Sequence, residues 1–95
     1  MTNAKDELIK HIAGREVEYV SIRHGSYVLD DIKPIKGTLE EVLPLLDFEY
    51  NAWCGSQHLD GCIWFADGTW SERVEYDGSE WWEHRERPRK EDYFE

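Results

Sequence analysis

The chain has 95 residues and a formal net charge of -10, from 11 Lys and Arg against 21 Asp and Glu. This length predicts a single domain over residues 1–95, since domains usually contain about 100–150 residues. Five Trp, five Tyr and three Phe distinguish the chain from disordered acidic segments, which lack such residues. We expect no direct binding to nucleic acid or to an anionic membrane, because phosphate groups require cationic side chains.

The start of the chain and its cysteines bear on cellular location. The first residues include acids and amides where a signal peptide would need an apolar run. No stretch approaches the roughly 20 apolar residues of a membrane span. Cys54 and Cys62 are too few for a disulfide framework, although a single bridge between them stays an alternative. We therefore expect a cytoplasmic protein with free thiols.

The first third of the chain predicts a helix followed by a hairpin. Thr2 or Asn3 can cap a helix over about residues 3–13, whose apolar stripe would comprise Leu8, Ile9, Ile12 and Ala13. Residues 16–23 are rich in β-formers, and a turn at 24–26 would lead into a second strand at 27–29. Residues 30–37 then read as a connector, because Pro34 has no backbone N–H to donate to a neighbouring strand.

A second short helix is predicted over about residues 38–47. Thr38 and Glu41 have the spacing of a capping box. The buried face of this helix would comprise Leu39, Val42, Leu43 and Leu46. Pro44 predicts a kink or an early end, since proline inside a helix removes a hydrogen bond. Residues 48–53 would add a further strand.

The C-terminal part predicts a β-meander over about residues 60–87, because Asp-Gly pairs at 67–68 and 77–78 separate three β-compatible runs. With two-residue turns, Arg73 would lie opposite both Trp82 and Cys62, and Trp70 and Trp81 would lie in the core. The second, wetter face of the sheet would carry Trp64, Arg73, Trp82 and His84. A three-residue loop at 66–68 would shift the first hairpin by one residue. Residues 88–95 read as a flexible tail. The fold class is therefore α+β, with two short helices and an antiparallel sheet of about five strands.

The segment from Gly61 to His84, with its pattern D-G-T-W followed by E-Y-D-G-S-E-W-W, resembles small acidic proteins of tailed bacteriophages and prophages. The resemblance covers about a quarter of the chain. It implies a viral origin, action in the cytoplasm of a host cell, and a role in host takeover or in blocking a defence system. It carries no catalytic residues over to this chain.

Three constellations in the sequence have the residue types of reactive sites. Zinc ligands would be Cys54, His58, Cys62 and His84, but the Cys-x3-His-x3-Cys spacing matches no standard zinc pattern. Cys54 or Ser56 beside His58 has the residue types of a nucleophilic site, without a surrounding motif. Glu72 and Glu83 could pair as acid and base, although a solvated strand edge explains them more simply. We therefore expect no enzyme activity, no metal and no cofactor.

The distribution of acids favours a protein partner with a basic surface. Clustered and evenly spaced carboxylates can occupy a groove that normally holds nucleic acid, and exposed Trp residues can anchor the contact. The residues expected to contact the partner are Asp30, Asp31, Glu40, Glu41, Glu72, Glu75, Glu80, Trp53 and Trp82. The leading hypothesis is a non-enzymatic phage-encoded binding protein that inhibits a host nucleic-acid-handling or defence complex, of the anti-CRISPR or anti-restriction type, through an acidic surface that partly mimics DNA. The alternatives are a structural or assembly protein, for instance a homodimer whose charge serves solubility, and then a small hydrolase or ligand-binding module.

Overall fold

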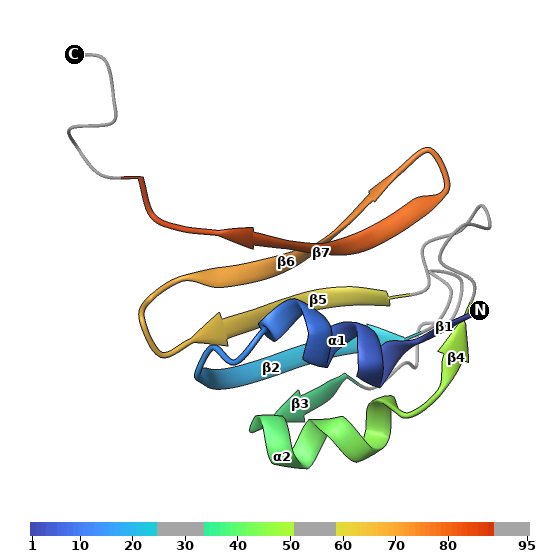
Figure 1. Ribbon diagram of the computed structural model, residues 1–95, viewed down its shortest axis with the longest axis horizontal. Coiled ribbons are helices and arrows are strands. Elements are labelled where there is room, and N and C mark those ends of the chain that lie inside the picture. The colour runs from blue at the N-terminus through green and yellow to red at the C-terminus, as the bar shows by residue number, and fades with distance from the viewer. Residues whose placement is uncertain (25–33, 51–58, 89–95) are drawn as a thin grey trace.

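The computed structural model describes residues 1–24, 34–50 and 59–88, and shows the α+β fold that the sequence predicts (Figure 1). Five strands form an antiparallel sheet in the order β3-β2-β5-β6-β7, and β1 pairs with β4 in a separate short ladder. In chain order the elements are β1 (Thr2–Asn3), α1 (Ala4–Ile12), β2 (Val17–His24), β3 (Ile35–Gly37), α2 (Leu39–Val42), the 3-10 helix η1 (Leu43–Leu46), β4 (Glu49–Tyr50), β5 (Leu59–Phe65), β6 (Trp70–Tyr76) and β7 (Ser79–Arg85). Among the described residues, no helix is long and apolar enough to cross a membrane.

Both helices begin at the caps that the sequence predicts. The side chain of Asn3 accepts a hydrogen bond from the backbone N–H of Asp6, and Thr38 forms a reciprocal capping box with Glu41. The second helix changes to 3-10 geometry at Leu43, directly before Pro44, as the expected kink requires. Of the stripe expected on α1, Leu8 and Ile12 are buried, whereas Ile9 is exposed. Ala13 is exposed too, because it ends the helix in a left-handed conformation.

The middle of the chain contains one strand that the sequence did not indicate. Ile35–Gly37, expected to be part of a connector, pairs with β2 as β3. Pro34 lies just before this strand at the edge of the sheet, where a missing N–H costs no ladder hydrogen bond. The expected strand at 27–29 lies outside the described residues. The expected strand at 48–53 is present as β4, within the described part of that range.

The predicted meander is present as β5, β6 and β7, and its second hairpin has the expected register, with Arg73 opposite Trp82. The first hairpin has the alternative register, in which Cys62 lies opposite Glu72 instead of Arg73. The reason is a three-residue loop: Phe65 N–H donates to Thr69 C=O, and Gly68 takes a φ of 89° inside the loop.

This one-residue difference exchanges the two faces of β6 and β7 relative to β5. The prediction that Trp70 and Trp81 lie in the core is therefore wrong. Trp70 is half-buried and Trp81 is 41 % exposed, whereas Trp82, expected on the wetter face, is buried. The core lies between the helices and one face of the sheet, and its residues are Ala4, Leu8, Ile12, Val20, Ile22, Val42, Leu46, Tyr50, Leu59, Ile63, Phe65 and Trp82.

Candidate binding surface

The second face of the sheet carries a row of aromatic side chains across adjacent strands. Both helices pack against one face of the sheet, here called the covered face, where they contribute to the core (Figure 1). Among the described residues no helix covers the other face, here called the open face. Tyr19 of β2 pairs with Trp64 of β5, which pairs with Trp70 of β6. The rings of Tyr19 and Trp64 lie 5.8 Å apart at a tilt of 55°. Their exposed fractions, 40 % and 42 %, leave both rings accessible to a partner.

A charged row runs beside the aromatic row on the open face. Cys62, Glu72 and Glu83 are consecutive cross-strand neighbours on β5, β6 and β7. One carboxylate oxygen of Glu72 accepts a hydrogen bond of 3.0 Å from the indole N–H of Trp70, and the other lies 3.1 Å from Nε of Arg85. These two contacts fix the Glu72 carboxylate at the surface while leaving its side chain 47 % exposed.

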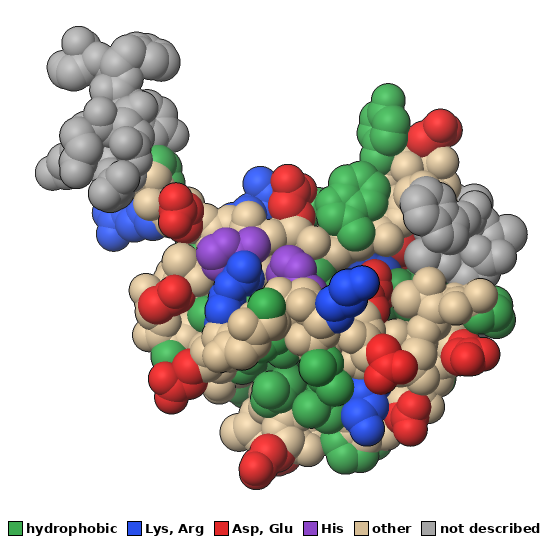
Figure 2. Space-filling model, viewed as in Figure 1, with side chains coloured by type: hydrophobic (Ala, Val, Ile, Leu, Met, Phe, Trp, Pro, Cys, Tyr) green, Lys and Arg blue, Asp and Glu red, His purple; other side chains and the backbone are tan. Residues whose placement is uncertain are grey.

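The far end of the β6–β7 hairpin adds a second apolar group to the open face. Val74 lies opposite Trp81, and Tyr76, near the turn, is 74 % exposed. This hairpin end projects from the body of the molecule, and hydrophobic side chains stand out from it in space-filling view (Figures 1 and 2). Large exposed aromatic groups of this kind are typical of protein interfaces.

A shallow depression of about 340 Å³ lies where β6 leaves β5. The β5–β6 ladder ends at the Cys62–Glu72 pair, whereas β5 continues to pair with β2 as far as Leu59. The depression is lined by Ser21, Asp60, Gly61, Cys62, Trp64, Glu72 and Arg73. Arg73 offers no exposed side-chain atoms there, because its side chain is wholly buried. The accessible charges in the lining are therefore those of two carboxylates.

The thiol in this lining is a poor nucleophile. Burial, followed by the charge of Glu72, raises the pKa of Cys62. Since the thiolate is the reactive form, a raised pKa makes Cys62 less reactive than an exposed thiol. The thiol can contribute weak polar contacts to a ligand.

The covered face of the sheet contains a buried ionic cluster around Arg73. Its guanidinium lies 2.8 Å from Glu80 and 3.1 Å from Glu7, and also donates to the hydroxyl of Tyr50. Tyr50 in turn donates to Glu7, and Glu80 also accepts the backbone N–H of Leu59 at 3.0 Å. Burial alone would lower the pKa of Arg73, but Glu7, Tyr50 and Glu80 outweigh burial and raise it. The cluster joins α1, β4, β5, β6 and β7, so its role is structural.

A serine–histidine pair lies nearby, on the same covered face. Nε2 of His11 is 2.7 Å from the hydroxyl of Ser71, a distance that suits proton transfer. Ser71 is wholly buried, however, so no substrate carbonyl can approach its oxygen. Burial, then the charges of Arg15 and His84, lowers the pKa of His11. The pair acts as a buried polar contact between α1 and β6.

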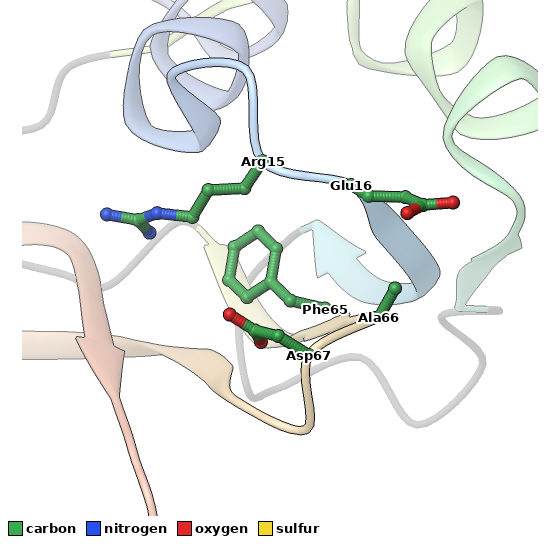
Figure 3. Close-up of a pocket in the computed structure, with 5 residues that line it drawn as sticks. All are labelled: Arg15, Glu16, Phe65, Ala66 and Asp67. Carbon is green, nitrogen blue, oxygen red and sulfur yellow. The ribbon is translucent and has the colours of Figure 1, made fainter.

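A second depression, of about 300 Å³, lies at the end of the sheet near the first hairpin loop (Figure 3). The guanidinium of Arg15 lies 5.3 Å from the ring centre of Phe65. In Figure 3 the charged ends of Arg15 and Glu16 point away from each other and not into a shared site. The carboxylate of Asp67 accepts hydrogen bonds from the backbone N–H and the hydroxyl of Thr69. This depression brings no set of reactive groups together.

Two of the residues expected to contact a partner are instead parts of the core. Glu80 belongs to the Arg73 cluster, and Trp82 packs against the guanidinium of Arg73 at 5.2 Å. Neither is available as a surface charge or an exposed anchor, because Glu80 is only 5 % exposed and Trp82 only 6 % exposed. The alternation of side chains along β7 causes this, since the register turns its even-numbered residues toward the helices.

The other expected contact residues are dispersed. Glu40 and Glu41 are exposed on α2, where hydrogen bonds from the backbone and side chain of Thr38 lower the pKa of Glu41. Glu75 is exposed and accepts the N–H of Gly78. Among the described members of the expected set, Glu72 alone lies in the aromatic part of the open face. Asp30, Asp31 and Trp53 lie outside the described residues.

The structure does not bring together the described members of the four residues considered as zinc ligands. Cys54 and His58 lie outside the described residues. Cys62 is on the open face, whereas His84 is on the covered side, where it contacts Thr69 at 2.9 Å. Within residues 1–24, 34–50 and 59–88, no group of three or more His, Cys, Asp or Glu is arranged to hold a metal ion.

Sequence reasoning missed Tyr19 and Trp81 as aromatic residues of the open face, and it placed Trp64 on the wetter face without counting it among the expected contact residues. A signal was present in the alternation of each strand, because Trp64 lies between the buried Ile63 and Phe65. For Trp81, adjacent to another Trp, the alternation alone could not say which of the two faces the core.

Comparisons with family models, with curated proteins and with solved structures found no match to the chain.

Proposed function

We propose that this chain is a non-enzymatic binding protein that inhibits a nucleic-acid-handling complex by occupying its basic surface. The contact is made through the open face of the sheet. The observation that carries the proposal is the juxtaposition, on one uncovered face, of accessible aromatic rings and a depression lined by two carboxylates, in a chain of net charge -10.

The aromatic groups supply the affinity in this proposal. Tyr and Trp dominate the binding energy of protein interfaces when they are central and become desolvated on contact. Tyr19, Trp64 and Trp81 are each close to 40 % exposed on the open face. Each can therefore bury further apolar area against a partner at a low cost in side-chain entropy.

The charge of the whole chain supplies the choice of partner. On the open face itself, Asp60, Glu72 and Glu83 are balanced by Arg23, Lys36 and Arg85. On the covered face, acidic side chains are scattered around the rim without forming one continuous patch (Figure 2). A net charge of -10 still attracts a cationic surface at a distance and speeds association with it. Long-range attraction, and not a copied row of phosphates, is the role we assign to the acids.

The resemblance to phage proteins points the proposal toward defence complexes. Restriction and CRISPR effectors have basic channels for nucleic acid, and a tightly bound acidic protein would block such a channel. Two observations on the described residues support a binding role: burial raises the pKa of the Cys62 thiol on the open face, and Ser71 is buried beneath the other face.

Self-association through the open face is the second candidate function. The same exposed rings that suit a partner would also suit a second copy of the chain. Sedimentation across a range of salt separates the two. A dimer that persists at low salt favours self-association, because the self-repulsion of two chains of charge -10 is then greatest.

The test of the proposal is capture followed by competition. The immobilised chain is exposed to the heparin-binding fraction of a bacterial lysate at 50 mM and at 300 mM NaCl, and retained complexes are identified by mass spectrometry. Each is then assayed for binding to duplex DNA with and without saturating chain. We expect salt-sensitive retention, since exposed charge pairs are screened over about 8–10 Å at physiological ionic strength, together with loss of DNA binding.

A pair of matched variants decides whether the open face is responsible. The double variant Tyr19→Ser, Trp81→Ser removes accessible aromatic area from the open face, whereas Ile9→Ser, Leu45→Ser removes exposed apolar area from α1 and η1. We expect the first to abolish inhibition of DNA binding and the second to preserve it. Retained complexes that bind DNA equally well with the chain present would refute the proposed function.

A further inference from the structure

We propose that the depression beside Trp64 is a receptor site for an arginine side chain of the partner. The inference rests on the proposed function and deepens it, because it names the group by which a basic surface is recognised. The depression lies on the open face and is lined by Ser21, Asp60, Gly61, Cys62, Trp64, Glu72 and Arg73.

The shape of the site follows from the backbone at Gly61. This glycine has a φ of +151°, and a Cβ atom there would lie 2.2 Å from the backbone oxygen of Ser21. Only glycine can adopt this conformation at so close an approach. Just beyond it, β6 no longer pairs with β5, since the described ladder ends at Cys62 and Glu72. The depression is therefore a built feature of the sheet and not a gap between flexible side chains.

The accessible charged groups that line the site are the carboxylates of Asp60 and Glu72. Asp60 is exposed, and the carboxylate of Glu72 is held by Trp70 and Arg85 through one contact to each oxygen. Each carboxylate oxygen can accept a second hydrogen bond, so both groups retain capacity for an incoming donor. Arg73 is a lining cation, but its side chain is wholly buried and paired with Glu7 and Glu80. The cations of the open face, Arg23, Lys36 and Arg85, are outside the lining. A cationic ligand with several donors complements this lining, and an anion does not.

Trp64 selects the guanidinium over the ammonium group. Its indole is 42 % exposed and forms one wall of the depression. A planar guanidinium can stack on an indole while its N–H groups point sideways to carboxylates, whereas an ammonium is compact and strongly hydrated. The covered face of the same sheet already contains such an arrangement, since the guanidinium of Arg73 lies 5.2 Å from the ring centre of Trp82 and 2.8 Å from Glu80.

The experiment uses nona-arginine and nona-lysine peptides as probes of the full chain. Binding is measured by calorimetry at 50 mM NaCl, and the indole N–H signals of the chain are followed by NMR. We expect the arginine peptide to bind about five- to tenfold more tightly than the lysine peptide, with the largest shift at the Trp64 indole. Equal affinity for both peptides, or a largest shift at another Trp, would overturn the inference.

Two pairs of variants place the site on named residues. Trp64→Leu and Asp60→Asn should each weaken binding of the arginine peptide by about fivefold or more. Leu45→Ala removes an exposed apolar side chain of η1, outside the open face, and Glu40→Gln removes an exposed carboxylate of α2. Both controls should change affinity by less than about twofold. Equal losses in all four variants would reduce the effect to general charge and apolar content, and would overturn the site.

The outcomes for this site and for the proposed function can be told apart. If complexes are captured and inhibited, but Trp64→Leu and Asp60→Asn inhibit as strongly as the unaltered chain, the arginine site is wrong and the function stands. If the arginine peptide binds with the expected selectivity but no complex loses DNA binding, the site stands and the inhibitory function is wrong.

Discussion

The two faces of the sheet use the same kinds of residue for opposite purposes. On the covered face, Arg73 is stacked on Trp82 and paired with Glu80, and all three are buried. On the open face, Arg85 pairs with Glu72 beside Trp70, but both charged side chains are more than 40 % exposed, at 42 % and 47 %. The comparison teaches that residue type does not separate buried structural charges from accessible surface charges in this chain. The position relative to the helices does.

The largest expected effect is the loss of the buried cation. Arg73→Met leaves the carboxylates of Glu7 and Glu80 in the interior without their partner, which costs about 3–5 kcal/mol of unfolding free energy. The matched change on the open face, Arg85→Met, should cost less than about 1 kcal/mol, since its pairs are solvent-exposed. Urea unfolding followed by Trp fluorescence measures both. Equal costs would contradict the difference between the faces.

The two adjacent tryptophans sharpen the same comparison. Trp82→Ala removes a buried ring from the core and should cost about 3–5 kcal/mol, enough to unfold a domain this small. Trp81→Ala should cost about 1 kcal/mol or less, because its ring is 41 % exposed. Thermal unfolding by circular dichroism distinguishes them. A larger loss in Trp81→Ala would mean that the faces of β7 are reversed.

The local parts of this fold could be predicted from the sequence, whereas the faces could not. Caps at Asn3 and Thr38 and the turn at 77–78 depend on residues within four positions of one another, and each is present. The faces of β6 and β7 depend on the length of one loop, where two and three residues were both compatible with Asp67-Gly68. The expected contact set failed with the faces, because Glu80 and Trp82 became core residues, whereas Trp81, expected in the core, became accessible.

The ionic cluster of the covered face had no signal in the sequence. Glu7, Tyr50, Arg73 and Glu80 are separated by up to 73 positions, and only the packing of α1 on the sheet brings them together. Nothing in local composition distinguishes Glu80 from Glu75, which is exposed. In a single sequence, a buried charge of this kind is indistinguishable from a surface acid.

A smaller effect is expected at the glycine that shapes the depression. Gly61→Ala forces a side chain into a backbone conformation with φ of +151° and against the oxygen of Ser21. We expect a loss of about 1–3 kcal/mol from this strain. Gly14→Ala, at a φ of +83° with nothing within 4 Å of the added Cβ, is the control and should cost about 1 kcal/mol. Equal melting temperatures for the two variants would contradict the claim that the close approach of Ser21 requires glycine at position 61.

The smallest expected effect is a pH dependence on the covered face. Burial lowers the pKa of His11 below the value of 6.5 that applies in the unfolded chain. Below pH 6.5 the unfolded state therefore binds more protons than the folded state, so His11 reduces stability as the pH falls through that value. Melting temperatures at pH 7.5 and 5.5 should differ less for His11→Gln than for the unaltered chain. An equal difference would show that His11 titrates normally.

The most direct measurement of the central claim is hydroxyl-radical footprinting of the chain alone and bound to a captured nucleic-acid-binding complex. Trp64 and Trp81 report on the open face, and Ile9 and Leu45 report on exposed apolar surface of α1 and η1. The account predicts that binding protects both tryptophans from oxidation and leaves Ile9 and Leu45 unchanged. Protection of Ile9 and Leu45, with Trp64 and Trp81 oxidised as in the free chain, would contradict it.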